Sequence, residues 1–358
     1  MKELRIIGLM SGTSLDGLDL AACTFRHDKT WNYSIDYCKT AGYSRELVSA
    51  LQCLDTSTAL KYAQTDHDLG RLFGTEVIRF ISETGFKPNY ISSHGHTVFH
   101  QPKKHLTTQI GHPAAIAALT KTPTIADFRT ADVHLNGQGA PLVPIGDLLL
   151  FSEYEYCLNL GGIANISIKT QEDSIQAYDI CIANMALNYV AQKVGKSYDA
   201  EGELASSGTI DTNLLEALNQ LPYLSLSAPK SIGKEWFDSE IKPLIEHHLA
   251  FSSTEDVLAT LCEHIALQVS AQLPVYGRLL VTGGGAKNDF LMNCLKARCN
   301  AQLILPETEL IDYKEALIFA FLGALHVLGE DNILTAVTGS SSNHVGGCIY
   351  RPFGMGKN

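Results

Sequence analysis

Apolar and polar positions at the start of the chain form two β-type runs around a small-residue turn. The first run extends from Ile6 to Met10 and meets the turn Ser11-Gly12-Thr13-Ser14. After Asp16-Gly17 a second apolar run extends from Leu18 to Phe25. Two such runs joined by Gly, Ser, Thr and Asp predict a β-hairpin.

The same arrangement returns about half a chain later. Tyr156–Leu160 is an apolar run, Gly161-Gly162 is its turn, and Ile163–Ile168 is the second run. A third apolar run, Leu279–Thr282, leads into Gly283-Gly284-Gly285. The match between the first two units is one of pattern and not of letters, and it indicates an internal repeat.

Apolar residues three and four positions apart predict the helices. Strands are expected at Trp31–Cys38, Tyr90–Val98 and Thr124–Arg129. Strands, glycine turns and helices in this order predict an α/β protein of two similar halves. The predicted helices are Arg45–Leu54, Thr65–Thr84, Ala114–Thr120, Asn184–Val194, Thr212–Gln220, Asp256–Gln272, Asp289–Arg298 and Glu315–Leu328.

The domain boundary is expected at a loop rich in glycine and proline, Asn136–Pro141. The first domain then covers residues 1–140 and the second covers 141–329. We expect the tail, from about residue 330 to 358, to pack back on the first domain. A length of 358 residues agrees with two domains.

Composition narrows the class of protein. Hydrophobic residues make up 45% of the chain and charged residues 18%, as in a globular protein with a substantial core. A net charge of −11 argues against nucleic acid or an anionic membrane as the main partner. The first apolar run is too short for a signal peptide or a membrane span. Nine cysteines without a CxxC pair indicate reduced thiols, and hence a cytoplasmic location. The oligomeric state stays open, a homodimer included.

Several common motifs are absent from the sequence. There is no P-loop, no G-x-G-x-x-G opening a βαβ unit, and no G-x-S-x-G nucleophile elbow. Five histidines lie close together in the sequence, but they have neither an HExxH helix nor cysteine partners, and the sequence does not indicate a zinc site there. They are His94, His96, His100, His105 and His112.

The first turn has the groups that a nucleotide phosphate needs. Gly12 and Gly17 allow close backbone approach, and consecutive N–H groups can form an anion nest. The hydroxyls of Thr13 and Ser14 add donors, while Asp16 and Asp19 could hold a hydrated Mg²⁺. An ordinary hairpin whose polar residues face water is the alternative.

Seven motifs together resemble one known family, the anhydro-N-acetylmuramic acid kinases. They are GLMSGTSLDGLD (8–19), SSHGHT (92–97), IADFRTADV (125–133), GQGAPLVP (137–144), LNLGGIANIS (158–167), PKSIGKEWF (229–237) and GGGAKNDFLM (283–292). The resemblance implies two ribonuclease-H-like domains of the actin/hexokinase/heat-shock-protein ATPase superfamily, with a nucleotide cleft between them. It also implies ATP and Mg²⁺ as cofactors and an amino sugar as the small-molecule substrate. The expected reaction opens the anhydro bridge of 1,6-anhydro-N-acetylmuramic acid with water and phosphorylates its 6-oxygen, in cell-wall recycling.

The resemblance also implies roles for single residues. The first turn matches the phosphate loop, Gly161, Gly162 and Asn165 match a second phosphate-side loop, and Gly283 to Gly285 with Asn288 match the adenosine-side turn. Asp16 or Asp19 would hold the metal through water. The full phosphate-loop set is Gly12, Thr13, Ser14, Leu15, Asp16, Gly17, Leu18 and Asp19, and the third turn contributes Gly283, Gly284, Gly285 and Asn288.

Asp179 matches the general base of the family. One carboxylate can deprotonate the attacking water, while transfer of the phosphoryl group takes up charge on the departing oxygen. An aspartate free on the surface is the alternative.

Substrate contacts are expected from a second group of residues. Arg129 is the first choice for the lactyl carboxylate because a guanidinium binds carboxylate with two N–H groups. Lys230 and Lys234 are alternatives, and Arg129 could instead form a salt bridge to Asp127 or Asp132. The whole substrate set is His94, Thr97, Asp127, Arg129 and Glu315. For Glu315, a place in the first turn of a helix would account for a glutamate on dipole grounds alone.

The chain departs from the family pattern in two places. Many members have Asp-Thr-Gly-Pro-Gly-Asn where this chain has the residues 179–184, DICIAN. Ile180 and Ile182 are β-branched and unsuited to positive φ, so we expect the loop to run differently. His96 stands where a glutamine is usual. A kinase for another sugar, or a sensor that binds sugar or nucleotide without turnover, therefore stays open.

Overall fold

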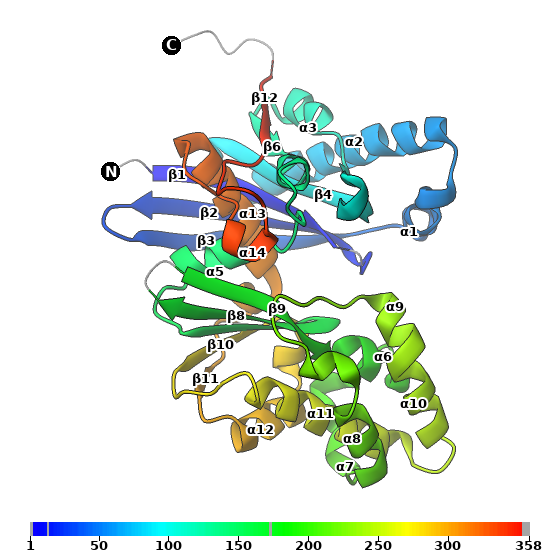
Figure 1. The fold of residues 1–358 in the computed structure, drawn as a ribbon. Coiled ribbons are helices and arrows are strands. Elements are labelled where there is room, and N and C mark those ends of the chain that lie inside the picture. The colour runs from blue at the N-terminus through cyan, green and yellow to red at the C-terminus, as the bar shows by residue number, and fades with distance from the viewer. Residues whose placement is uncertain (1–2, 13, 172–173, 353–358) are drawn as a thin grey trace. The chain divides into compact units, whose positions relative to one another are not determined.

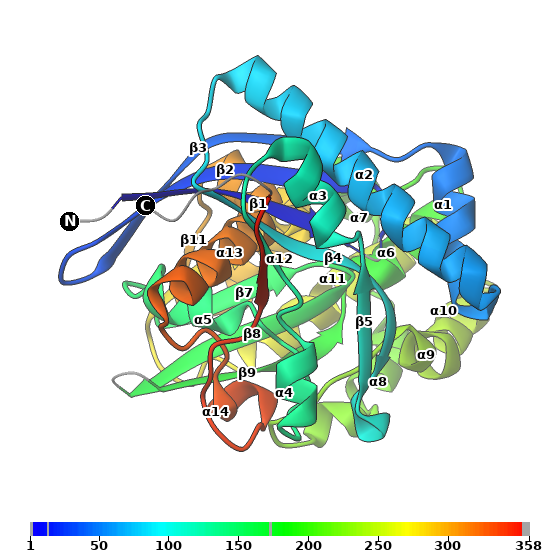
Figure 2. The same ribbon diagram turned by 90° about the horizontal axis from the view of Figure 1, so that it is seen from above.

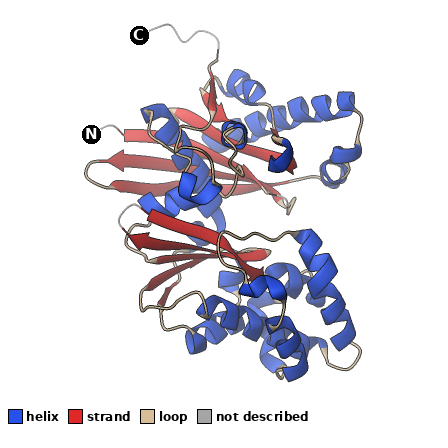
Figure 3. Cartoon of the chain, in the orientation of Figure 1, coloured by secondary structure: helices blue, strands red, loops and turns tan. Residues whose placement is uncertain are grey.

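The computed structural model describes residues 3–12, 14–171 and 174–352. Their contacts divide the chain into two compact units. Unit 1 consists of residues 1–151 and 313–358, and unit 2 of residues 152–312. Each unit is built from one mixed β-sheet with helices packed on it (Figures 1 and 3).

The sheet of unit 1 begins with the predicted hairpin. Its strand order is β12-β6-β4-β1-β2-β3, with β5 beside β4. β1 and β2 are antiparallel and Ser11 pairs with Leu18 at the closed end, whereas β4 runs parallel to β1. The strands are β1 (Glu3–Ser11), β2 (Gly17–His27), β3 (Trp31–Gly42), β4 (Tyr90–Gln101), β5 (Leu106–Ile110), β6 (Thr124–Ala126) and β12 (Cys348–Tyr350).

The sheet of unit 2 repeats this topology. Its order is β11-β10-β7-β8-β9, the counterpart of β6-β4-β1-β2-β3. In both sheets three antiparallel strands are followed by two that run parallel to the first. The expectation of two ribonuclease-H-like domains is therefore confirmed. The strands are β7 (Tyr156–Leu160), β8 (Ile163–Gln171), β9 (Ser174–Ile182), β10 (Arg278–Thr282) and β11 (Gln302–Ile304).

Two helices cover opposite faces of β1 in unit 1 (Figure 2). Alternate residues of a strand point to opposite faces. Ile7 and Leu9 belong to one buried cluster with Leu69, Phe73 and Val77 of α2. Gly8 lies on the other face, where a Cβ would be 1.9 Å from the carbonyl oxygen of Ala316 in α13. Only glycine therefore allows α13 this close to the sheet.

Most helices begin and end near their predicted limits, and two begin earlier. α2 begins at Ala59 because Thr58 caps it, and α13 begins at Thr308 with a non-helical residue at Tyr313. The helices are α1 (Arg45–Gln52), α2 (Ala59–Thr84), α3 (Pro113–Thr120), α4 (Thr130–His134), α5 (Pro144–Leu149), α6 (Asn184–Gln192), α7 (Glu203–Ser207), α8 (Thr212–Asn219), α9 (Lys234–Trp236), α10 (Lys242–His248), α11 (Thr254–Ser270), α12 (Asp289–Arg298), α13 (Thr308–Leu328) and α14 (Thr335–Thr338). Short 3₁₀ turns cover Leu54–Thr56, Pro102–Lys104, Ala200–Gly202, Pro222–Ser225 and Gly284–Lys287, and Phe237–Ile241 is a π-helical turn.

The chain passes from one unit to the other at residues that differ from the expected boundaries of 140 and 330. The chain leaves unit 1 after Phe151 and returns to it at Tyr313. The physical reason is that α5 and α13 both pack within unit 1, where Lys314 Nζ lies 2.7 Å from Asp147 Oδ1 and both side chains are buried. A buried ion pair holds two segments together because separating either charge leaves the other uncompensated.

The tail contributes to the sheet of unit 1. β12 pairs with β6 in antiparallel fashion, Ile349 opposite Ile125. Among the described residues, every helix is too short or too polar to span a bilayer.

Candidate active site

The first turn is tight. The amide of Leu15 donates to the carbonyl of Gly12 at 3.3 Å, and Leu15 has a positive φ of 62°. At Gly17 a Cβ would be 2.4 Å from the carbonyl oxygen of Ala41, so this glycine is required by packing. Ser14 is exposed, and Thr13 lies outside the described residues. The turn therefore presents Ser14 at the surface.

A hydrogen-bonded network fixes the start of this turn. The hydroxyl of Tyr43 donates to Ser11 Oγ at 2.7 Å, and Ser11 Oγ lies 3.1 Å from His96 Nδ1. His96, the residue that replaces the usual glutamine, is therefore joined to Ser11 through a ring nitrogen. Burial lowers the pKa of His96, and a hydrogen bond with the backbone of Ser11 opposes this shift. Ser11 and Tyr43 were not predicted; Ser11 lies inside the motif, but Tyr43 becomes its neighbour only in the folded sheet.

Two carboxylates of the turn differ in their surroundings. Asp16 is exposed, while Asp19 is half-buried on β2 and accepts a hydrogen bond of 2.6 Å from Thr40 Oγ1. Leu18 between them is buried in the core of unit 1 and can offer a ligand only its backbone. Carboxylate oxygens are the ligands that a hydrated Mg²⁺ uses, and this turn carries two carboxylates.

Arg129 and His94 are hydrogen-bonded to each other. Arg129 Nε and Nη2 lie 3.1 and 2.9 Å from His94 Nε2, and Arg129 Nη1 donates to the carbonyl of Gly139. His94 Nδ1 lies 2.9 Å from the carbonyl of Gly95. Because carbonyl oxygens only accept, Nδ1 carries the proton and Nε2 accepts from Arg129. Both ring nitrogens of His94 are thus engaged within unit 1.

Burial shifts the pKa of each member of this group, and neighbouring charges either add to that shift or oppose it. Burial, reinforced by Arg129, lowers the pKa of His94 well below its usual value. Burial lowers the pKa of Arg129 to about 10, opposed by Glu315 and Asp132. Glu315 has an accessible surface, yet desolvation raises its pKa against the pull of Arg129 and Lys314. Arg129 remains a cation at neutral pH beside a carboxylate that it helps to keep ionised.

Asp127 and Thr97 complete the predicted substrate set in unit 1. Asp127 follows β6, is exposed, and has a positive φ of 63°. Thr97 Oγ1 accepts from Gln109 at 3.3 Å. Within unit 1, Asp127 and His94 line a polar cavity of about 270 Å³. Arg129 forms its hydrogen bonds with His94 and Gly139, and so the alternative of a salt bridge to Asp127 or Asp132 is not what its contacts show.

In unit 2 the two glycine turns lie against each other. At Gly283 a Cβ would be 2.9 Å from the carbonyl of Leu160, and at Gly285 it would be 2.7 Å from Leu160 Cβ. Gly283 has a φ of 82° that side chains rarely adopt. Gly161 and Gly162 accept hydrogen bonds from the amides that begin α6.

A row of polar residues crosses the sheet beside these turns. Asn159 pairs with Asn165 on β8, and Asn165 pairs with Asp179 on β9. Residues directly opposite in antiparallel strands point to the same face. Asn159 was not predicted, although an asparagine between two buried leucines is a visible sign in the sequence.

The segment 229–237 holds Asp179. The amide of Ile232 donates to Asp179 Oδ2 at 3.1 Å, and the amide of Asp179 donates to the carbonyl of Lys230 at 3.2 Å. The hydroxyl of Tyr223 donates to the backbone carbonyl of Asp179 at 2.8 Å. Burial raises the pKa of Asp179, and hydrogen bonds from Ile232 and Ser231 oppose the rise. Asp179 is therefore a fixed, half-buried carboxylate and not a free surface side chain.

The unusual sequence after Asp179 continues a strand. β9 extends to Ile182, which pairs with Ile163, and a bulge lies opposite Ala164 and Asn165. β-branched isoleucines suit a strand, and this explains why the segment has no need of the glycines and proline found in many family members.

The two lysines and Asn288 are already engaged. Lys230 Nζ donates to the carbonyl of Leu224 at 3.2 Å and lies 4.8 Å from the centre of the Tyr223 ring. Lys234 pairs with Asp238. Asn288 caps α12 by accepting from the amide of Leu291 at 2.9 Å. In these positions all three support unit 2.

Comparisons of the sequence with a family model and with single proteins all point to the same family. A family model described as anhydro-N-acetylmuramic acid kinase matches residues 4–352. The chain is 38% identical to the anhydro-N-acetylmuramic acid kinase of Vibrio cholerae serotype O1, covering 97% of this chain and 98% of that one. It is 36% identical to the protein of the same name from Pasteurella multocida, covering 98% of each.

Among solved structures, an activator of 2-hydroxyisocaproyl-CoA dehydratase from Clostridium difficile is 13% identical, with a TM-score of 0.43 over 91% of this chain and 97% of that one. The family assignment depends on the sequence matches, which extend over nearly the whole chain. The chain belongs to the anhydro-N-acetylmuramic acid kinase family.

Proposed function

We propose that this chain converts 1,6-anhydro-N-acetylmuramic acid, water and ATP into N-acetylmuramic acid 6-phosphate and ADP. The observation that supports this most strongly is the setting of Asp179. A half-buried carboxylate is held by Ile232 in a row with Asn165, beside two glycine turns of the kind that admit phosphate. The choice of sugar is supported by the name of the matching family, anhydro-N-acetylmuramic acid kinase.

Asp179 would act as the general base. Its carboxylate takes a proton from the water that attacks the anomeric carbon, and the bond from that carbon to the bridge oxygen breaks. Burial raises the pKa of Asp179, which makes the carboxylate a better proton acceptor than a solvated aspartate. The hydrogen bonds from Ile232 and Ser231 keep the carboxylate ionised and oriented.

The bridge oxygen would leave as O6 and attack the γ-phosphorus of ATP. The phosphoryl group then takes up the charge that a separate general acid would otherwise neutralise. We assign the triphosphate to the turns at Gly12–Asp19, Gly161-Gly162 and Gly283–Gly285. Asp16 and Asp19 would hold Mg²⁺, which supplies charge neutralisation at the phosphates when bound.

Arg129 would bind the lactyl carboxylate. Its bonds to His94 and Gly139 leave one N–H on each terminal nitrogen, enough for a carboxylate. His94 then acts through Arg129, because both of its ring nitrogens are engaged.

The product assay in heavy-oxygen water tests this function. Protein, anhydro sugar and MgATP are mixed in H₂¹⁸O, quenched early and measured by mass spectrometry. We expect one ¹⁸O at the anomeric hydroxyl and none in the phosphate. N-acetylmuramic acid 6-phosphate kept alone in the same water measures exchange that needs no enzyme.

Other outcomes identify other functions. Tight sugar binding without ADP release would indicate a sensor, and ADP release only with a different sugar would indicate a related kinase. We place the reaction in the cytoplasm, in cell-wall recycling, because nine cysteines without a CxxC pair suit a reducing compartment.

A further inference from the structure

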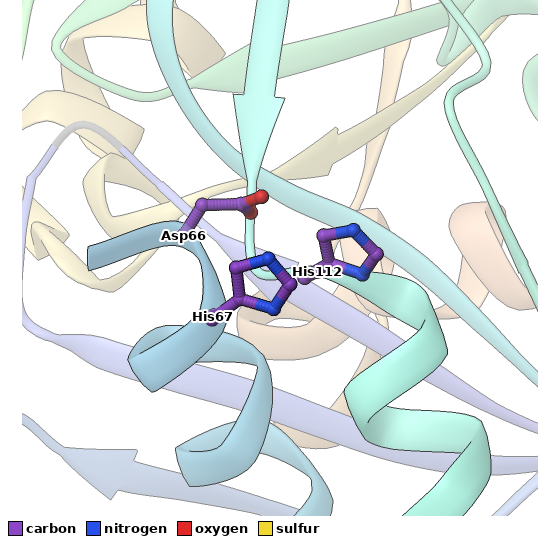
Figure 4. A group of neighbouring side chains, drawn as sticks. All are labelled: Asp66, His67 and His112. Carbon is purple, nitrogen blue, oxygen red and sulfur yellow. The ribbon is translucent and has the colours of Figure 1, made fainter. Parts of the chain in front are cut away.

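A second group of chemically active side chains lies in unit 1 (Figure 4). Asp66 and His67 belong to α2, and His112 is the N-cap residue of α3. One ligand atom from each lies within 4.8 Å of the others. The proposed reaction assigns no function to these residues, although Asp66 and His112 share a cavity with His94 and Asp127 of the substrate set.

The backbone holds two of the three residues firmly. The amide of Gly111 donates to Asp66 Oδ1 at 2.8 Å, and the amide of His112 donates to the carbonyl of Asp66 at 3.0 Å. At Gly70 a Cβ would be 2.6 Å from the carbonyl oxygen of His112, so α2 and the start of α3 are in close contact. Hydrogen bonds of this kind orient a carboxylate that coordinates a metal.

The three side chains form a donor set of two imidazoles and one carboxylate. The rings of His67 and His112 are stacked, with centroids 4.3 Å apart and planes 13° apart. In stacked rings the nitrogen lone pairs lie in nearly parallel planes, so one ring must turn before both nitrogens can bind the same ion. His67 is exposed and can turn about its side-chain torsions, so its nitrogen can move toward the other two ligands.

His112 also has a ring nitrogen to offer. Its Nδ1 accepts a hydrogen bond of 3.3 Å from the amide of Ala114, near the long limit for such a bond. An ion bound at Nδ1 would displace this long hydrogen bond from Ala114. The start of α3 would keep its other hydrogen bond, from the amide of Ala115 to the backbone carbonyl of His112.

Room for further ligands lies on one side. Asp66 and His112 line the cavity of about 270 Å³, together with Asp127, Thr130 and Tyr350. The cavity is large enough for several water molecules, which would complete the coordination of an ion. Asp66 and Asp127 place two carboxylates on the lining of this cavity, which favours a cation there.

We propose that Asp66, His67 and His112 bind one divalent transition-metal ion of the zinc class. Two histidines and a carboxylate suit Zn²⁺ or Co²⁺, with water in the remaining position, and do not suit Mg²⁺. The ion would join α2 to the start of α3 and thereby stabilise unit 1 by binding only its folded form.

Titration with Co²⁺ tests the site, because its visible absorption distinguishes thiolate ligands from imidazole and carboxylate. The full chain is freed of metal with a chelator and titrated by absorption and calorimetry. We expect one Co²⁺ per chain, a spectrum without thiolate bands, and a rise of Tm that Mg²⁺ does not give. His67→Asn and His112→Asn should each weaken binding by about tenfold or more.

The variants are chosen to keep the fold. Asparagine at position 112 preserves an N-cap residue, and His67 is exposed. His134→Asn is the matched control, since His134 is stacked on His105 at 6.3 Å and belongs to no described cluster of metal-ligating residues. The proposal is overturned if wild type binds no Co²⁺, if thiolate bands appear, or if His67→Asn binds as tightly as His134→Asn.

Discussion

Asp179 is held by backbone contacts with Lys230 and Ile232 of a distant segment, and this makes its role testable. Asp179→Asn removes the proton acceptor and changes little in shape. We expect kcat to fall by about 10²–10⁴-fold, the usual contribution of general base catalysis. Binding of a non-hydrolysable ATP analogue should stay as it is in wild type, measured by calorimetry. Asp238→Asn is the control, because Asp238 pairs with Lys234 and does not contact Asp179 in any described interaction. Full activity of Asp179→Asn would contradict the assignment of Asp179 as the general base.

The hydroxyl of Ser231 lowers the pKa of Asp179 through a hydrogen bond. We therefore expect removal of this hydroxyl to shift the pH dependence of kcat/KM. The base must be ionised, so kcat/KM falls as pH drops through this pKa. In Ser231→Ala the pKa of Asp179 rises further, and the acidic limb of the profile should move to higher pH. A role of Ser231 in folding alone would leave the limb in place. Ser239→Ala, which loses only a long bond to the carbonyl of Trp236, should match wild type.

At the residue scale the sequence identified the glycine turns and Asp179, because motifs are continuous stretches of chain. It missed Asn159, Tyr43 and the contact between Ser231 and Asp179. Such partners are distant in sequence and meet only through strand register or loop packing. Arg129 was predicted, but its tight pairing with His94 was not, since nothing in the letters shows which way a guanidinium points.

At the scale of elements, the turn after β10 depends on one glycine. Gly283 has φ 82° and ψ 163°, and a Cβ there would be 2.5 Å from Asn159 Oδ1. Gly283→Ala should cost about 1–3 kcal/mol from backbone strain alone. We expect a lower Tm, by about 2–12 °C for a unit of this size, and weakened binding of an ATP analogue.

Gly284→Ala is the matched control for this turn. Gly284 is exposed, its φ is not positive, and the nearest atom to a Cβ there is 3.7 Å away. Its Tm should stay close to that of wild type. If both variants lost the same stability, the conformation of Gly283 would not be the cause.

The hairpins were predictable because alternation and glycine turns define them locally. The extent of β9 was less predictable, since Ile180 and Ile182 replace residues that many family members use for a loop. The early start of α13 also escaped prediction, because four of the seven residues 308–314 are polar and the continuous apolar stretch begins only at Ala316.

At the scale of the whole molecule, the candidate residues are divided between two units. Kinases that close on their substrates exclude water that would waste ATP. We therefore expect the radius of gyration to decrease when the sugar and an ATP analogue are both present, measured by X-ray scattering. Identical profiles with and without both ligands would contradict closure.

The length of the chain and its internal repeat predicted two domains, but they did not predict the residues at which the chain passes from one unit to the other. Asn136–Pro141 is rich in turn formers, yet the chain continues through α5 before it leaves unit 1. What decides the boundary is the buried contact of Lys314 with Asp147, which links segments far apart in sequence.

The interrupted course of unit 1 has a consequence for synthesis. A ribosome releases residues 152–312 as one continuous piece, whereas the first 151 residues emerge without α13 and β12. The usual rule that the first domain folds first is then reversed, because the apolar face around Gly8 stays uncovered until the last segment appears. A nascent chain arrested before Tyr313 should resist protease in its later half and be cut in its earlier half.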